Sequence, residues 1–123
     1  MKPVDAFITF CYTPDLTASA RFYEEGLGLS LAVDQGRCRI YRVAGSGYLG
    51  LCEKSGAEAT QGVLLTFVTD DVDAWFARAV DAGATVDRAP AHNPEFGIYQ
   101  CFVRDPVGYV VEIQRFDDPG WSG

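Results

Sequence analysis

Long apolar runs, paired cysteines and basic residues are scarce in this 123-residue chain. No segment approaches the roughly 20 consecutive apolar residues of a membrane-spanning helix, so we expect no membrane partner. Acidic residues outnumber basic ones, 17 to 10, and the net charge of −7 argues against nucleic acid as a partner. Residues 62–123 hold 10 acids against 4 bases. This leaves open a solubilising surface or the attraction of a cationic ligand.

The four cysteines form no Cys-x-x-Cys pair and lie mostly inside apolar, strand-like runs, at Cys11, Cys38, Cys52 and Cys101. A chain of this length buries roughly two-thirds of its unfolded surface, so it needs no disulfide to stay folded. We therefore interpret the cysteines as buried reduced thiols of a cytoplasmic protein, in preference to a disulfide or a zinc site.

One order of elements, a strand, a helix and three more strands, occurs twice along the chain. Alternating β-branched and aromatic residues between turn residues predict the strands. In the first half we expect them at 5–13, 29–34, 37–43 and 48–53, and in the second half at 62–69, 85–88, 98–103 and 109–115. A loop is expected at 90–94. The strand at 5–13 is expected to be buried.

Each half holds one helix with recognisable ends. The first is capped by Thr13 or Asp15 and stops near Gly26, and the second carries an apolar stripe over 72–80 and stops at Gly83. One helix covers only one face of a sheet. We therefore expect the other face to be covered by the other half, a second subunit or a ligand.

These elements predict a single α+β domain over 1–123. Its two βαβββ modules occupy about 5–53 and 62–116, joined by a small polar linker at 54–61 and followed by a tail at 117–123.

The last strand carries the most unusual side chain. Asp105-Pro106-Val107-Gly108 suits a tight type I turn, and after it Val110, Glu112 and Gln114 share one strand face. A carboxylate therefore projects from the middle of an apolar strand. Its partner is left open between a metal, a substrate cation, an arginine and water.

Several motifs in this order resemble the vicinal oxygen chelate superfamily, which holds glyoxalases, bleomycin-resistance proteins and extradiol dioxygenases. The resemblance spans 5–116, and the matching residues are Asp15-Leu16, Ser19, Phe22-Tyr23, Leu27-Gly28-Leu29, Asp71-Val72-Asp73-Ala74, Ala82-Gly83 and Asp105 to Ile113. It implies paired βαβββ modules whose mixed sheets curl around a cleft, with helices outside, and a homodimer. It does not fix the function, because one fold hosts many activities.

Metal-using relatives place metal ligands on the first and last strands of each module. At those positions this chain has Ile8 or Phe7, Leu64, and Gly50 or Leu51, and only Glu112 keeps a donor. Glu53, at a strand end, and His92, in a loop, are the other candidate ligands. Because such sites generally need three protein ligands, we predict no metal and no cofactor.

The family register implies a largely apolar cleft lined by Ile8, Phe10 and Tyr12 from one module and by Leu64, Thr66 and Val68 from the other. Arg37 and Arg39 share a strand face with Tyr41, so they either hold an anionic group, pair with Glu112 or lie exposed. His92, the only histidine, lies in a loop that either lids the cleft or faces solvent.

Two functions fit this cleft. The first is metal-independent binding of a hydrophobic or aromatic small molecule, either neutral or cationic, as in antibiotic-sequestering relatives. The alternative is a lyase or isomerase that uses Glu112 as base, with His92 or an arginine as partner and with or without a divalent metal. A domain whose pocket has decayed is the third reading.

Overall fold

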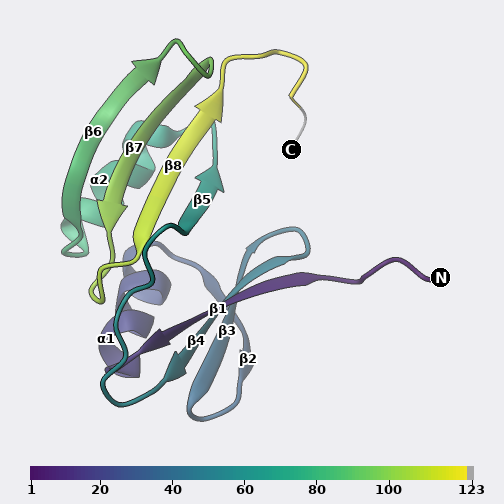
Figure 1. Ribbon diagram of the computed structural model, residues 1–123, viewed down its shortest axis with the longest axis vertical. Coiled ribbons are helices and arrows are strands. Elements are labelled where there is room, and N and C mark those ends of the chain that lie inside the picture. Colours follow the sequence, from purple (N-terminus) through teal and green to yellow (C-terminus); the bar gives the residue numbers. More distant parts are fainter. Residues whose placement is uncertain (122–123) are drawn as a thin grey trace. The chain divides into compact units, whose positions relative to one another are not determined.

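The computed structural model describes residues 1–121. The chain divides into two compact units that meet at Ala59 and Thr60, and each unit has its own four-stranded sheet and its own helix (Figure 1).

The first unit contains β1 (Phe7–Thr13), α1 (Leu16–Ala20), η1 (Arg21–Gly26), β2 (Ser30–Asp34), β3 (Cys38–Ala44) and β4 (Gly47–Glu53). The strand order is β1-β4-β3-β2. β1 runs parallel to β4, while the other neighbours are antiparallel.

The first helix begins where the sequence predicts. The Asp15 side chain accepts a hydrogen bond from the backbone N–H of Ala18, at 3.1 Å, and so caps α1. Its continuation η1 widens to a π-helical turn, in which the Leu27 N–H donates to the Phe22 carbonyl, five residues back, at 2.9 Å.

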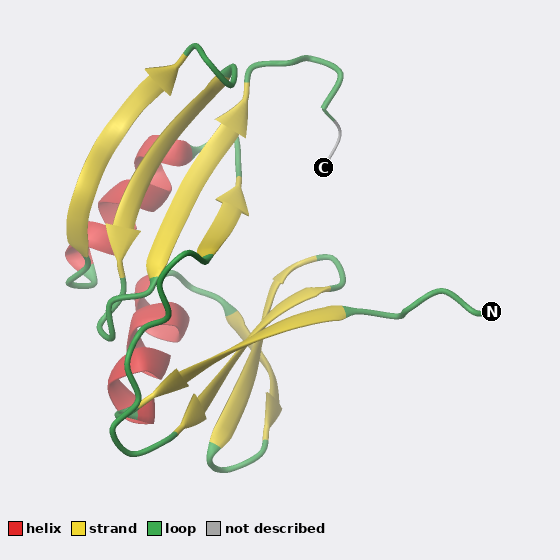
Figure 2. Ribbon diagram, in the orientation of Figure 1, coloured by secondary structure: helices red, strands yellow, loops and turns green. Residues whose placement is uncertain are grey.

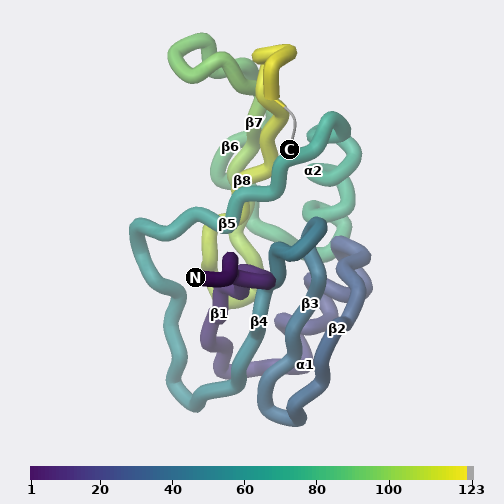
Figure 3. Tube along the Cα trace, turned by 90° about the vertical axis from the view of Figure 1, so that its right-hand side faces the viewer, coloured from purple at the N-terminus to yellow at the C-terminus, as the bar shows by residue number. Residues whose placement is uncertain are grey.

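The second unit repeats this plan with β5 (Leu64–Val68), α2 (Val72–Asp81), β6 (Thr85–Asn93), β7 (Ile98–Arg104) and β8 (Val110–Phe116). The order is β5-β8-β7-β6, with β5 parallel to β8. Figure 2 shows α2 against one face of this sheet, and Figure 3 shows the same layering from the side. The predicted α+β fold with two βαβββ modules is confirmed.

Each sheet has a helix-covered face and an open face, the one opposite its helix. On β5, Leu65 and Phe67 are buried, whereas Leu64 and Val68 are about half exposed. On β1, Cys11 and Thr13 are buried, whereas Phe10 is 50% exposed. The prediction that 5–13 is buried therefore holds for one side of the strand only, because period-two alternation sends every second side chain to the open face.

The β7–β8 turn is held by one carboxylate. Asp105 Oδ1 accepts from the backbone N–H groups of Val107, Gly108 and Tyr109, each at 2.9 Å. The Gly108 N–H also closes the turn onto the Asp105 carbonyl at 3.0 Å, and its φ of 111° lies in the left-handed region that favours glycine. The predicted tight turn is confirmed.

Two predictions are wrong. The expected loop at 90–94 is mostly strand, since β6 continues to Asn93. β6 is the edge strand, where Pro90 needs no ladder partner for its missing N–H.

The second error concerns the cysteines. Cys38 and Cys52 form a disulfide, because the β3–β4 register places them directly opposite each other. Cys11 and Cys101 are buried thiols, as predicted. The two positions are 14 apart in the sequence, so their spacing did not reveal the contact.

Candidate functional site

A cavity of about 450 Å³ opens on the open face of the second sheet. Its apolar wall comes from Leu64, Phe96, Ile98, Phe102 and Phe116, and its polar groups are Arg88, Asn93, Gln100, Glu112 and Gln114. We call this cavity the β5–β8 pocket. All ten lining residues belong to the second unit.

Glu112 is only 7% exposed, and two side chains hold its carboxylate in place. Thr66 Oγ1 donates to Oε1 at 2.8 Å, and Gln100 Nε2 donates to Oε2. Because a buried carboxylate is stable only when hydrogen-bonded, these two donors explain how an apolar strand accommodates it.

The Gln100 amide is itself oriented. Asn93 Nδ2 donates to Gln100 Oε1 at 2.8 Å, so the opposite end of that amide, its Nε2, faces Glu112. Asn93, Gln100, Glu112 and Thr66 form one chain of hydrogen bonds across β6, β7, β8 and β5. We call it the polar relay.

The sheet register brings the relay together. Glu112 stands beside Thr66 on one neighbour and beside Phe102 on the other, while Gln114 stands beside Gln100. Residues directly paired across strands share a face, so one open face collects side chains from four strands.

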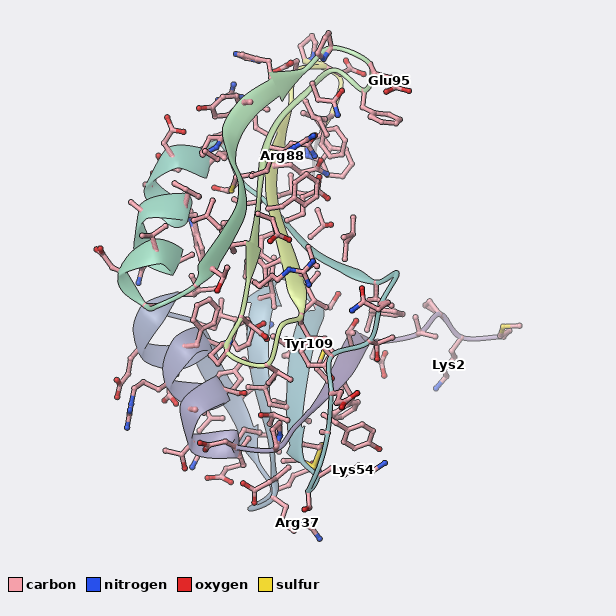
Figure 4. All side chains as sticks on the ribbon, turned by 60° about the vertical axis from the view of Figure 1, so that its left-hand side comes forward. Lys2, Arg37, Lys54, Arg88, Glu95 and Tyr109 are labelled. Carbon is pink, nitrogen blue, oxygen red and sulfur yellow. A yellow bond between two sulfur atoms is a disulfide. The ribbon has the colours of Figure 1, made fainter. Side chains whose placement is uncertain are left out.

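Irregular pairing on β6 adds Arg88 to the same face. The register shifts between Val86 and Arg88 and again between Arg88 and Ala91, and at the second shift three steps along β6 span two along β7. This inserted residue reverses the alternation, so that Arg88 and Asn93, one even-numbered and one odd-numbered, both line the pocket. Figure 4 shows Arg88 on the side of the sheet away from α2.

Three of the predicted site residues meet here. Leu64 and Glu112 line the pocket, and Thr66 is bonded to Glu112. His92 lies opposite Tyr99 in the register, and its ring packs on the Tyr99 ring with centroids 4.8 Å apart. Since the Tyr99 hydroxyl donates to Asp73 of α2, His92 is on the helix-covered side and the structure does not bring it to Glu112.

The predicted arginines and aromatic residues of the first unit lie elsewhere. Arg39 is paired with Leu51 and shares the helix-covered face with Tyr41, whose hydroxyl donates to Glu24 of η1 at 3.1 Å. Arg37 Nη2 donates to the Glu53 carbonyl at the end of the sheet. The structure therefore places neither arginine on the open face.

Ile8, Phe10 and Tyr12 do share the open face of the first sheet, as the alternation predicts. Tyr12 also borders a smaller cavity of about 310 Å³, where the Lys54 ammonium group lies 5.0 Å from its ring centre.

Sequence reasoning missed Arg88, Asn93 and Gln100. Gln100 carried a usable signal, because it is a polar residue in the middle of an apolar strand, as Glu112 is. Arg88 carried none, since its orientation depends on the register shifts of β6.

A metal does not fit this site. Within residues 1–121 no three His, Cys, Asp or Glu side chains are grouped to hold an ion. The side chains around Glu112 offer amide and hydroxyl groups, and no second carboxylate or imidazole lines the pocket. No helix in the described part of the chain has the length and apolar character to cross a bilayer.

Over residues 7–113 the chain matches the Glyoxalase/Bleomycin resistance protein/Dioxygenase superfamily, and it belongs to that superfamily. The comparison with curated proteins gives no match.

Solved structures share the fold. A glyoxalase-related enzyme from Fulvimarina pelagi is 25% identical with a TM-score of 0.78, over 96% of this chain and 91% of its own. A lactoylglutathione lyase from Agrobacterium tumefaciens is 26% identical with a TM-score of 0.71, over 98% and 100%. TioX from Micromonospora sp. ML1 is 20% identical with a TM-score of 0.74, over 91% and 98%.

Proposed function

We propose that this chain binds a hydrophobic or aromatic small molecule in the β5–β8 pocket without using a metal. One observation carries the proposal: a largely apolar cavity has a single carboxylate, Glu112, held rigidly among its walls. Apolar pockets of about 300–1,000 Å³ with a few fixed polar groups are typical small-molecule sites.

Glu112 sets the polar requirement. Each of its oxygens accepts one hydrogen bond and keeps a further lone pair. A ligand with an N–H or O–H group is therefore favoured, and a cationic amine belongs to this class. Sequestration of such a molecule is the role we propose.

Members of the superfamily bind small molecules and often form dimers. We extend this to a homodimeric, cytoplasmic protein. Apolar side chains on both open faces, such as Phe10 and Leu64, support a covering partner.

Thermal-shift screening with aromatic compounds, followed by calorimetry with and without EDTA, tests the binding function. We expect a stoichiometric ligand that raises the melting temperature and whose affinity survives chelation. Phe102→Ala should weaken that ligand, whereas Val86→Ala, on β6 outside the pocket, should not. Loss of all binding in EDTA would contradict the proposal.

Glu112 also supports a second candidate, a lyase or isomerase. Its carboxylate lines a pocket in a chain 26% identical to a protein named lactoylglutathione lyase. As a base it must reach a substrate proton at hydrogen-bond distance. Turnover that falls at least a hundredfold in Glu112→Gln while binding persists would favour the enzyme, and unchanged turnover would exclude Glu112 as base.

A further inference from the structure

We infer that the ligand of the β5–β8 pocket carries an anionic group bound by Arg88, beside a hydrogen-bond donor accepted by Glu112. This rests on the proposed binding function and specifies its ligand class: a planar, aromatic organic acid that also bears an N–H or O–H group.

Arg88 differs from the other arginines of its unit. Arg104 pairs with Asp87 at 2.8 Å, while Arg78 and Arg115 lie over the rings of Trp75 and Tyr99. Among residues 60–121, Arg88 is the arginine for which the structure shows no hydrogen bond, ion pair or ring contact. Its guanidinium lines the pocket with its donors available to a ligand.

The nearest carboxylate in sequence does not neutralise this cation. Asp87 precedes Arg88 directly, yet its carboxylate is taken by Arg104. Glu112, the pocket's own carboxylate, already accepts one hydrogen bond on each oxygen, from Thr66 and Gln100. Since the negative group is already compensated by donors and the positive one is not, the pocket favours an anion at Arg88.

The irregular backbone of β6 places Arg88 on the pocket side of the sheet. Two register shifts flank Arg88 in β6, and without the second shift Arg88 and Asn93 would point to opposite faces. The surrounding unit is acidic, with 10 acids against 4 bases in residues 62–123. A local arginine is therefore needed to attract an anionic group there.

Three rings from the β6–β7 hairpin and β8 complete the site: Phe96, Phe102 and Phe116 supply an aromatic wall. A flat ring system resting on this wall gains apolar burial, while its acid group meets Arg88 and its donor meets Glu112. A purely cationic ligand satisfies Glu112 but is repelled by Arg88.

The probes are three molecules with one ring system: indole-3-acetate, indole-3-acetamide and tryptamine. We expect calorimetry to show that the acetate binds about tenfold more tightly than the amide, with tryptamine weakest. Raising NaCl to about 0.5 M should lower the ratio of acetate affinity to amide affinity, because salt screens an exposed guanidinium.

Arg88→Gln should reduce the ratio of acetate affinity to amide affinity to about one, chiefly by weakening the acetate. Arg78→Gln, which removes the same charge from α2 on the other side of the sheet, should keep the ratio. Methylation of the indole nitrogen should weaken the acetate severalfold through loss of the donor to Glu112.

The outcomes separate the two claims. If none of the three indoles binds the parent protein, the proposed function is overturned together with the inference. If the indoles bind but the acetate and amide have equal affinity, or Arg88→Gln leaves their ratio unchanged, the inference alone is overturned. Circular dichroism of Arg88→Gln checks its folding, which an exposed side chain should not alter.

Discussion

The two units share one topology but differ in the polar side chains on their open faces. In the second unit the open face holds Glu112 and Gln100, while the helix-covered face is apolar at Val103 and Ile113. In the first unit the helix-covered face holds Arg39 and Tyr41, and the open face carries Ile8 and the Arg42 guanidinium over the Tyr48 ring. Among the described residues, a buried carboxylate on the open face occurs in the second sheet, at Glu112, and not in the first.

The contrast is sharpest at one pair of positions. Thr66 beside Glu112 in the second unit corresponds to Phe10 beside Gly50 in the first. The Phe10 ring lies over Gly50 so closely that a Cβ there would overlap it. A ring in one unit thus takes the space that a hydrogen-bonded carboxylate takes in the other, and a shared backbone gives two different surfaces.

The largest effect should come from the turns that precede the last strand of each unit. Asp105→Ala removes the side-chain acceptor of three backbone N–H groups, of which that of Gly108 keeps the backbone carbonyl of residue 105. We expect a loss of about 3 kcal/mol in the free energy of unfolding, measured with urea. Ser46→Ala, in the corresponding β3–β4 turn, should change it by less than about 0.5 kcal/mol. If both substitutions changed the free energy of unfolding equally, the two turns would not differ in how much they depend on a side chain.

Replacing Glu112, the pocket carboxylate, should give the second largest loss in the free energy of unfolding. Glu112→Leu leaves the Nε2 group of the buried Gln100 without its acceptor, so we expect a loss of about 2 kcal/mol in the free energy of unfolding. Glu112→Gln should lose less than about 1 kcal/mol, because the Thr66 hydroxyl can accept where it now donates. Denaturant unfolding of both variants checks this order, and a Leu variant as stable as the parent would show that the relay adds no stability.

The apolar helix-covered face of the second unit predicts a pH dependence. Burial raises the pKa of the Cys101 thiol to about 11, whereas Arg39 occupies the matching position in the first unit. The neutral thiol is favoured in the folded state. Its stabilisation is therefore complete below about pH 9 and is lost as the pH rises towards 11.

Between pH 8 and 11 the free energy of unfolding should decline by up to about 2 kcal/mol. Part of this decline should disappear in Cys101→Ala. A smaller decline should remain, because burial also raises the pKa of Tyr41. A Cys101→Ala variant with the parent's full decline would contradict this assignment.

The smallest effect concerns Gly50. Gly50→Ala should cost about 1 kcal/mol, because the exposed Phe10 ring has to turn away. In a Phe10→Ala background the same change should be neutral or slightly stabilising. A double-mutant cycle with no coupling energy would show that the position of the Phe10 ring does not require a glycine at position 50.

The sequence predicted the local features well. The repeated order of elements, the Asp15 cap and the Asp105 turn depend on neighbouring residues, and the structure confirms each. Strand alternation also separated Glu112 from its apolar neighbours. The partners of Glu112 were not predictable in this way, because Gln100 and Thr66 reach it across strands that are distant in sequence.

By itself, then, the sequence determined the two βαβββ modules and an isolated carboxylate in an apolar strand, since both follow from short-range pattern and chemistry. Tertiary structure decided which face each helix covers, that Cys38 and Cys52 meet, and that Arg88 points into the pocket. The physical reason is that strand register depends on long-range pairing, and one inserted residue reverses which side chains share a face.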